Sequence, residues 1–190
     1  MMGPTGGVTA RSIPILVVRD HRENVRKCTL SRLEGTPGVS FIRAAPRAGR
    51  PADFETGPGI LLDVDGECLG PGDSRFLEDG GRLILLDSTW ARLPSLRRRL
   101  ALPDPSRIAV RSLPRGILTA YPRVSKVRED PRAGLASIEA LFAALFILGS
   151  PRPDLLAGYR WAEEFLEASR EFLAASPNDS SRRSEGSVER

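Results

Sequence analysis

Three short apolar runs whose polarity does not alternate constrain the fold of this 190-residue chain most strongly. They are Ile13 to Val18, Gly59 to Val64 and Leu83 to Leu86, and Gly, Asp or Arg residues bound them. Runs of this kind predict strands of a sheet that is covered on both faces. Helical patterns lie between them, so the sequence predicts an α/β domain with a mostly parallel sheet and helices on both faces.

Four segments have the residue pattern of helices. The third is apolar almost all round and ends at Gly149, so it predicts a buried helix. The fourth has a narrower apolar stripe, which is typical of a surface helix with one docked face. The four segments run from Asp73 to Glu78, from Thr89 to Leu100, from about Ser137 to Leu148, and from Asp154 to Ala174.

The ends of the chain differ in composition from its centre. Residues 1–11 are rich in Gly and Thr and lack the apolar core of a secretory signal, so we expect a flexible leader. From Ser176 onward Val188 is the only aliphatic residue, which predicts a disordered tail over residues 176–190. Residues 12–175 are long enough to form one domain with its own core.

Arginine carries nearly all of the positive charge, because Lys27 and Lys126 are the only lysines in a chain of net charge +4. Its planar guanidinium suits phosphates and base edges, although a GC-rich genome or a merely solvated basic surface would give the same bias. Cys28 and Cys68 are too few for a disulfide framework, which favours a cytoplasmic location. No run approaches the roughly 20 apolar residues of a membrane span, so we expect no membrane association.

Several familiar chemistries lack their residues in this sequence. It contains neither a G-x-G-x-x-G segment after a strand nor a phosphate-binding G-x-x-x-x-G-K-[ST] segment. His21 is the only histidine, and with two cysteines it cannot complete a common zinc site, so we expect no metal. Cys28 as a nucleophile needs a nearby base. A half-buried small apolar side chain is the simpler interpretation of Cys28.

Polar and aromatic residues follow two of the predicted strands, where ligands bind in parallel α/β sheets. The first set is Asp63, Val64 and Asp65, and the second is Asp87, Ser88, Thr89 and Trp90. A tryptophan at such a position is costly to leave exposed, and it forms either a pocket wall or part of the core.

Four segments, in order, resemble the ribosome-biogenesis aminocarboxypropyltransferases of eukaryotes and archaea. HRENVRKCTLSRL (His21 to Leu33) resembles D-P-K-K-C-[ST]-G-[KR]-[KR]-L, and LILLDSTWARL (Leu83 to Leu93) resembles V-D-[CT]-S-W-A. LASIEALFAALFILG (Leu135 to Gly149) is similar to L-S-x-[VL]-E-A with an apolar helix after it. YRWAEEFLEASREFL (Tyr159 to Leu173) is similar to F-K-W-G-x-x-F-[IL]-x-x-N-x-x-L. The related DTW-domain transfer RNA enzymes share the D-x-x-W turn and the helix start.

The resemblance implies a SPOUT-like fold with a C-terminal trefoil knot. It also implies transfer of the 3-amino-3-carboxypropyl group of S-adenosylmethionine to a uridine or pseudouridine of small-subunit ribosomal RNA. The partner would be that RNA or a pre-ribosomal particle, and we expect a monomer. Three alternatives stay open: a transfer RNA substrate, a non-catalytic assembly factor that binds ribosomal RNA, and methyl transfer from the same donor.

By resemblance, an apolar slot for the donor's adenine would be formed by Leu62, Val64, Trp90, Leu118, Leu135 and Ala140. Thr29 is a candidate for a hydrogen bond to the donor, or else a helix cap. Asp87 is the candidate catalytic residue. It could order its loop, accept from the donor's amino group or take the proton from the target nitrogen, while its structural alternative is an N-cap.

Basic side chains would hold the phosphates of an RNA whose target base is presented in a loop or extruded from a stack. A solvated surface is the alternative for the same residues, especially for the run of three arginines. The candidates are Arg26, Lys27, Arg32, Arg43, Arg47, Arg97, Arg98 and Arg99.

The sequence departs from the family pattern at three places. TAYPRVSK, from Thr119 to Lys126, stands where the family has A-x-N-P-x-x-Y-G, so contacts to the donor or target base would differ. Ala136 replaces the serine that would cap the buried helix, and Ser137 is expected to shift the cap by one residue. Asp63-Val64 and Gly70-Pro71-Gly72-Asp73 replace the family's S-P and S-P-x-D.

Overall fold

A computed structural model describes residues 12–45, 54–101, 105–122 and 134–175. Its centre is a five-stranded sheet in the order β2-β1-β5-β4-β7, and all of its strand pairs are parallel. A short parallel pair lies apart from it, formed by β3 (Phe54–Glu55) and β6 (Leu100–Ala101). The five strands are β1 (Ile15–Asp20), β2 (Val39–Ala44), β4 (Gly59–Cys68), β5 (Arg82–Asp87) and β7 (Ile108–Ser112).

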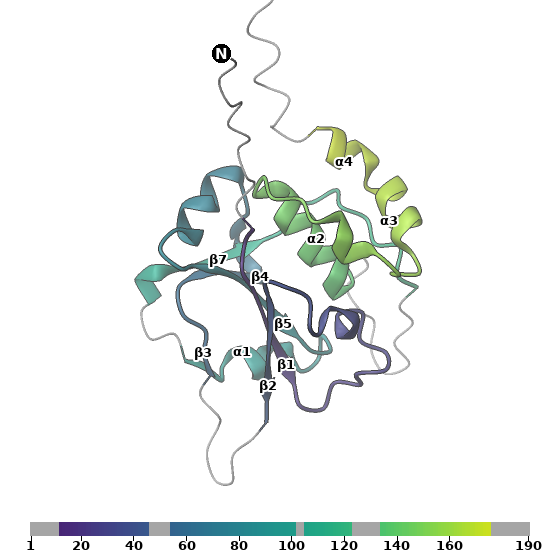
Figure 1. Cartoon of the computed structure of the whole chain (residues 1–190). Helices are drawn as coiled ribbons and strands as arrows, with labels where there is room; N and C mark the ends of the chain where they lie inside the picture. The colour runs from purple at the N-terminus through teal and green to yellow at the C-terminus, as the bar shows by residue number, and fades with distance from the viewer. Residues whose placement is uncertain (1–11, 46–53, 102–104, 123–133, 176–190) are drawn as a thin grey trace, which may run out of the picture.

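Alternate residues of the strands face two separate hydrophobic clusters. Ile15, Val17, Leu83 and Leu85 pack in a cluster with α2 (Ser137–Ile147), whereas Leu16, Val18, Ile84 and Leu86 pack in a cluster with Leu96 of α1 (Leu93–Arg97). Helices therefore cover both faces of the sheet, as the non-alternating strands predict (Figure 1). The expected α/β class with a parallel sheet is confirmed.

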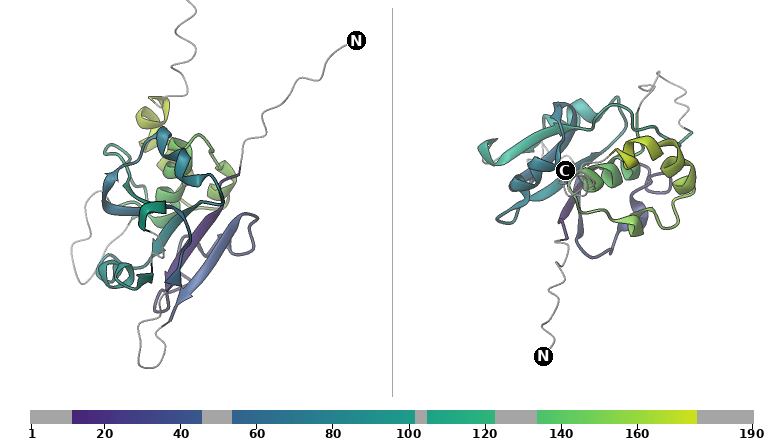
Figure 2. Two further views of the ribbon diagram at one scale, coloured as in Figure 1. Left: turned by 90° about the vertical axis from the view of Figure 1, so that its left-hand side faces the viewer. Right: turned by 90° about the horizontal axis from the view of Figure 1, so that it is seen from above.

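The C-terminal helices lie beside α2. Phe165 of α3 (Ala162–Ala168) meets Phe142 of α2 edge-to-face, with ring centroids 5.9 Å apart. Figure 2 shows α3 and α4 (Arg170–Ala174) next to α2 from two further sides. The other elements are 3₁₀ turns: η1 (Ser31–Leu33), η2 (Pro71–Leu77), η3 (Pro105–Arg107) and η4 (Pro153–Leu156).

Three of the predicted helices are wrong in extent or type. The segment Thr89 to Leu100 holds only the short α1, because a turn precedes it and β6 begins at Leu100. Asp73 to Glu78 forms the 3₁₀ turn η2. Asp154 to Ala174 is divided into η4, α3 and α4, and Gly158 lies between the first two with a φ of 70°, a conformation that ends a helix.

The strand predictions were too few and one was too short. The predicted strand Gly59 to Val64 continues to Cys68, with a register shift between Leu62 and Glu67 where both residues pair with Arg111. This shift makes residues 63–66 bulge from the ladder. Edge strands β2 and β7 were not predicted, and neither were β3 and β6. The knot stays a prediction, and the proposed leader and tail lie outside the described residues.

Candidate functional site

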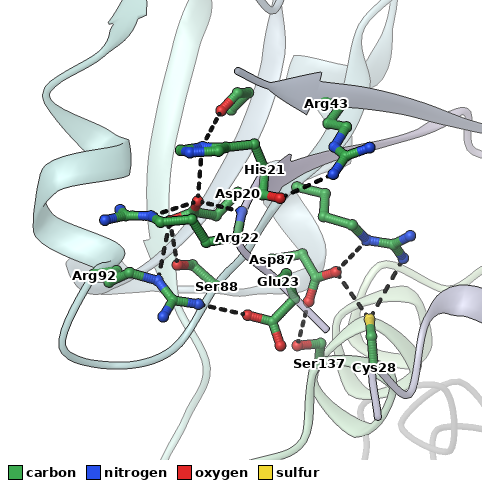
Figure 3. A network of polar contacts seen from close by, with 12 residues as sticks. Asp20, His21, Arg22, Glu23, Cys28, Arg43, Asp87, Ser88, Arg92 and Ser137 are labelled. Carbon is green, nitrogen blue, oxygen red and sulfur yellow. Dashed lines mark hydrogen bonds and ion pairs between the residues drawn. The ribbon is translucent and has the colours of Figure 1, made fainter. Parts of the chain in front are cut away.

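Asp87 ends the central strand β5 and gathers side chains from three other parts of the chain (Figure 3). Its Oδ2 accepts hydrogen bonds from Arg19 Nε at 2.8 Å and from Cys28 Sγ at 3.0 Å. Its Oδ1 accepts a hydrogen bond from Ser137 Oγ, at the start of α2, at 3.3 Å. Asp87 is 3% exposed, so these contacts replace most of its hydration.

Arg19 supplies the positive charge that makes this buried carboxylate tolerable. Burial opposes the charged form of Arg19, but the hydrogen bonds to Asp87 and Glu34 and the nearby negative charges together outweigh it and raise the pKa of Arg19. The guanidinium also contacts Glu34 at 2.5 Å and lies 4.7 Å from the ring centre of Phe41. The pair holds β1 and β5 together at their carboxyl ends, where Arg19 is opposite Asp87 in the ladder.

Cys28 is half-buried, in agreement with the simpler interpretation of its role. Burial, together with the neighbouring carboxylate of Asp87, raises the pKa of the thiol to about 11. His21 is engaged elsewhere, since its Nδ1 lies 3.1 Å from the carbonyl oxygen of Ala44 and 3.2 Å from Asp20 Oδ1. Cys28 therefore has the contacts of a hydrogen-bond donor and not those of a nucleophile.

A second buried carboxylate, Glu139 in the first turn of α2, is fully enclosed at 0% exposure. It accepts the hydroxyl of Thr119 at 2.6 Å and the hydroxyl of Tyr159 at 3.0 Å. It also accepts the backbone N–H groups of Ala120 at 3.0 Å and Ala136 at 2.8 Å. Glu139 thus fixes the segment around Thr119 and Ala120 to the start of α2 and to the C-terminal region.

The start of α2 differs from the prediction. Its N-cap is Ala136, which has no side-chain oxygen, and the hydroxyl of Ser137 bonds to Asp87. The expected shift of the cap to Ser137 is therefore wrong. Half of a capping box remains, because Glu139 accepts the N–H of Ala136. Asp87 does not cap the helix that follows it, since α1 begins at Leu93 with Arg92 as its N-cap.

A pocket of about 560 Å³ lies between the bulge of β4 and α1. Trp90 and Val64, two of the residues predicted for the adenine slot, line it together. The indole Nε1–H of Trp90 is buried and has no hydrogen-bond partner among the described residues. The other lining residues are Asp63, Asp65, Leu93, Pro94, Arg97, Arg98 and Leu100.

The remaining residues of the predicted slot lie elsewhere. Leu62 and Leu135 pack in the cluster on the α2 side of the sheet, and Ala140 is half-buried in α2 itself. Leu118 is 55% exposed. Thr29 is half-buried next to Cys28. The structure therefore brings Val64 and Trp90 into one pocket, while Leu62 and Leu135 are core residues in this conformation.

The predicted RNA-binding residues differ in their surroundings. Arg26, Lys27 and Arg98 are exposed. Arg32 and Arg43 are also exposed but donate to backbone carbonyls, those of Ala157 at 3.4 Å and His21 at 3.0 Å. Arg97 pairs with Asp63 at 3.1 Å and with Asp65 at 3.7 Å, and Arg99 is half-buried. Arg47 lies outside the described residues.

Arg19 and Asp20 are the site residues that sequence reasoning missed. Both are charged yet buried at the end of β1, at 6% and 2% exposure. The signal was their position directly after the apolar run that ends at Val18, at the same sheet edge as Asp87. Glu139 appeared only within the quoted segment Leu135 to Gly149, although a carboxylate in an otherwise apolar helix needs buried donors.

Neither a family model nor a curated protein matches this chain. A solved structure does: the SAM-dependent rRNA:acp-transferase Tsr3 from Vulcanisaeta distributa, with a TM-score of 0.61 and 23% sequence identity. The chain has the fold of that transferase. The match covers 86% of this chain and 82% of Tsr3, so the likeness in fold extends over most of both chains.

Two further findings concern the described residues. None of their helices has the length and apolar character needed to cross a membrane. No group of three His, Cys, Asp or Glu side chains among them is arranged to hold a metal ion.

Proposed function

We propose that this protein transfers the 3-amino-3-carboxypropyl group from S-adenosylmethionine to a uridine or pseudouridine of small-subunit ribosomal RNA. The observation that carries the proposal is that two buried carboxylates join all four resembling segments. Asp87 binds Cys28 and Ser137, which links the first three segments. Glu139 binds Tyr159, which links the third to the fourth. Distant segments that meet at one sheet edge are expected of a shared site.

In the proposed reaction, a ring nitrogen of the base attacks the γ-carbon of the donor's methionine portion. A new C–N bond forms, the bond from that carbon to the sulfonium breaks, and methylthioadenosine leaves with the electron pair. The nitrogen loses its proton to solvent or to a nearby carboxylate. The sulfonium is a good leaving group, so positioning of the two reactants supplies most of the catalysis.

The residues present fit such a donor. Asp87 offers a carboxylate for the donor's ammonium group, Ser137 offers a hydroxyl next to it, and Thr29 follows Cys28, which also contacts Asp87. The pocket beside Trp90 combines apolar walls, from Val64, Leu93 and Trp90 itself, with charged side chains, a mixture that suits a ligand with both an aromatic ring and polar groups. Asp87 already accepts hydrogen bonds on both oxygens, which favours a binding and ordering role over that of a general base.

The RNA side of the proposal rests on exposed cations near the carboxyl ends of the strands. Arg26 and Lys27 follow β1, and Arg43 is the second-last residue of β2. Guanidinium and ammonium groups at this edge suit the phosphates on either side of a base that reaches Asp87. The fold likeness to an rRNA-modifying transferase favours ribosomal RNA over transfer RNA as the substrate.

The test is to incubate the protein with S-adenosylmethionine and small-subunit ribosomal RNA that lacks the modification, and to identify the small-molecule product by mass. We expect methylthioadenosine only when RNA is present. Trp90→Ala and Asp87→Asn should abolish it, whereas Asp154→Asn, which changes an exposed carboxylate of an exposed ion pair, should not. Donor affinity is measured in parallel by calorimetry.

Each other outcome points to a definite alternative. S-adenosylhomocysteine as the product would make the protein a methyltransferase. Methylthioadenosine formed with transfer RNA but not with ribosomal RNA would identify transfer RNA as the substrate. Absence of both product and donor binding would leave a non-catalytic ribosomal RNA-binding protein of the same fold.

A further inference from the structure

We infer that Asp20 is a positioning residue whose carboxylate fixes the segment Ser88 to Arg92 and thereby holds Trp90 in the wall of its pocket. The part of this inference that concerns donor binding rests on the proposed function. The part that concerns Trp90 does not. Asp20 ends β1, next to the end of β5 from which the segment departs (Figure 3).

The carboxylate of Asp20 is 1% exposed and is surrounded by donors. Its Oδ2 accepts the hydroxyl of Ser88 at 3.2 Å and Arg92 Nε at 3.2 Å. Its Oδ1 accepts the backbone N–H of Arg22 at 3.0 Å and Arg22 Nε at 3.2 Å, and His21 Nδ1 lies at 3.2 Å. One buried carboxylate thus holds both its own loop and a segment 68 residues away.

Trp90 lies midway between the two anchored residues, Ser88 and Arg92. The segment has no regular secondary structure, and its own backbone supplies only a turn in which the N–H groups of Arg92 and Leu93 donate to the Thr89 carbonyl at 2.9 and 3.0 Å. The Trp90 indole N–H adds no anchor among the described residues. The two contacts to Asp20 are therefore side-chain restraints on both ends of the short segment that carries Trp90.

The charges around Asp20 keep these contacts in place. Burial alone would raise the pKa of Asp20, but hydrogen bonds from the side chain and backbone of Arg22 and the charge of Arg92 hold it well below its usual range. Arg92 is in turn bonded to Glu23 at 3.1 Å, so its guanidinium is fixed from two sides. A charged acceptor makes each of these hydrogen bonds about twice as strong as a neutral one.

The chain has two tryptophans, so the experiment uses the full chain with Trp161→Phe, in which Trp90 is the one tryptophan left. Acrylamide quenching and the emission maximum then report the exposure of Trp90 without any ligand. We expect Asp20→Asn to raise the quenching constant about twofold and to shift the emission to the red, because the anchors of Ser88 and Arg92 weaken. Asp154→Asn in the same background is the matched control and should change neither.

Donor binding and turnover separate positioning from a general loss of structure. In the same background, Asp20→Asn should weaken the affinity for S-adenosylmethionine about tenfold and raise KM accordingly, with kcat at saturating donor within about threefold. If Asp20→Asn fails to melt cooperatively, Ser88→Ala decides, since it removes one anchor and leaves the charge network intact. It should raise the quenching constant by a smaller factor.

Unchanged Trp90 quenching in a folded Asp20→Asn or Ser88→Ala variant overturns the inference, whatever happens to turnover. Increased quenching with unchanged donor affinity overturns the link to donor binding. If the parent protein binds no donor, the proposed function fails, and the quenching result still decides whether Asp20 positions Trp90.

Discussion

Replacing Glu139 by glutamine tests whether one buried carboxylate organises the centre of this protein. Its two oxygens accept four hydrogen bonds, two from the hydroxyls of Thr119 and Tyr159 and two from the backbone N–H groups of Ala120 and Ala136. An amide keeps one oxygen and turns the other acceptor into a donor. The hydroxyls can rotate to accept from that amide, but a backbone N–H cannot.

The expected loss follows from this geometry. Either orientation of the amide points its NH₂ group at one backbone donor, and an unsatisfied buried donor costs about 1–3 kcal/mol. The remaining hydrogen bonds lose their charge assistance, about half of their strength. Removal of a buried charge offsets part of this. We expect Glu139→Gln to lower the free energy of unfolding by about 2–4 kcal/mol, and Tyr159→Phe by about 1.5 kcal/mol.

Urea unfolding monitored by circular dichroism measures both changes. Glu164→Gln on the exposed side of α3 is the matched control, with an expected change of about 0.5 kcal/mol or less. The double variant Glu139→Gln/Tyr159→Phe should cost less than the sum of the two single changes, because they share one hydrogen bond. A loss below about 0.5 kcal/mol for Glu139→Gln, or strict additivity in the double variant, would refute the reasoning.

Three further predictions concern two positions, Cys28 and Gly59. At pH 8 Cys28 should react with iodoacetamide at least about tenfold more slowly than an ordinary thiol. The rise in its pKa from 9.0 to about 11 lowers the fraction of thiolate about 100-fold, and the greater nucleophilicity of that thiolate recovers about tenfold of the rate. Peptide mapping checks this with exposed Cys68 as the internal control, and equal labelling would contradict it. The same raised pKa stabilises the fold below about pH 9, a contribution lost as pH rises toward 11, so unfolding measured across that window should become easier. Gly59→Ala should destabilise the fold by more than about 3 kcal/mol in the same urea assay. The φ of Gly59 is 142°, and the added Cβ would lie 2.0 Å from the carbonyl oxygen of Arg82. A change below about 1 kcal/mol would show that the backbone relaxes.

Elements with a strong local pattern were predicted well from the sequence. The all-apolar helix was placed within one residue of α2, since a helix without a polar face can only be buried. The central strand Leu83 to Leu86 was also correct in type and place. Edge strand β2 was missed because only one of its six residues is buried and its pattern mixes polar and apolar side chains. The helix predicted from Thr89 was wrong at its start, because the hydrogen bonds from Ser88 and Arg92 to Asp20 hold this segment in a turn that the local sequence pattern does not show.

The sequence by itself determined the α/β class, the buried helix, and the positions of Asp87 and Trp90 at and just after the end of a strand, because these depend on hydrophobic pattern and on residue type. Only the tertiary structure decided which side chains meet there. Arg19 and Asp87 are 68 residues apart, and they pair because β1 lies next to β5 in register. That neighbourhood follows from the order of strands in the sheet, which short-range patterns do not encode, and the cost of burying a carboxylate then selects the partners that surround it.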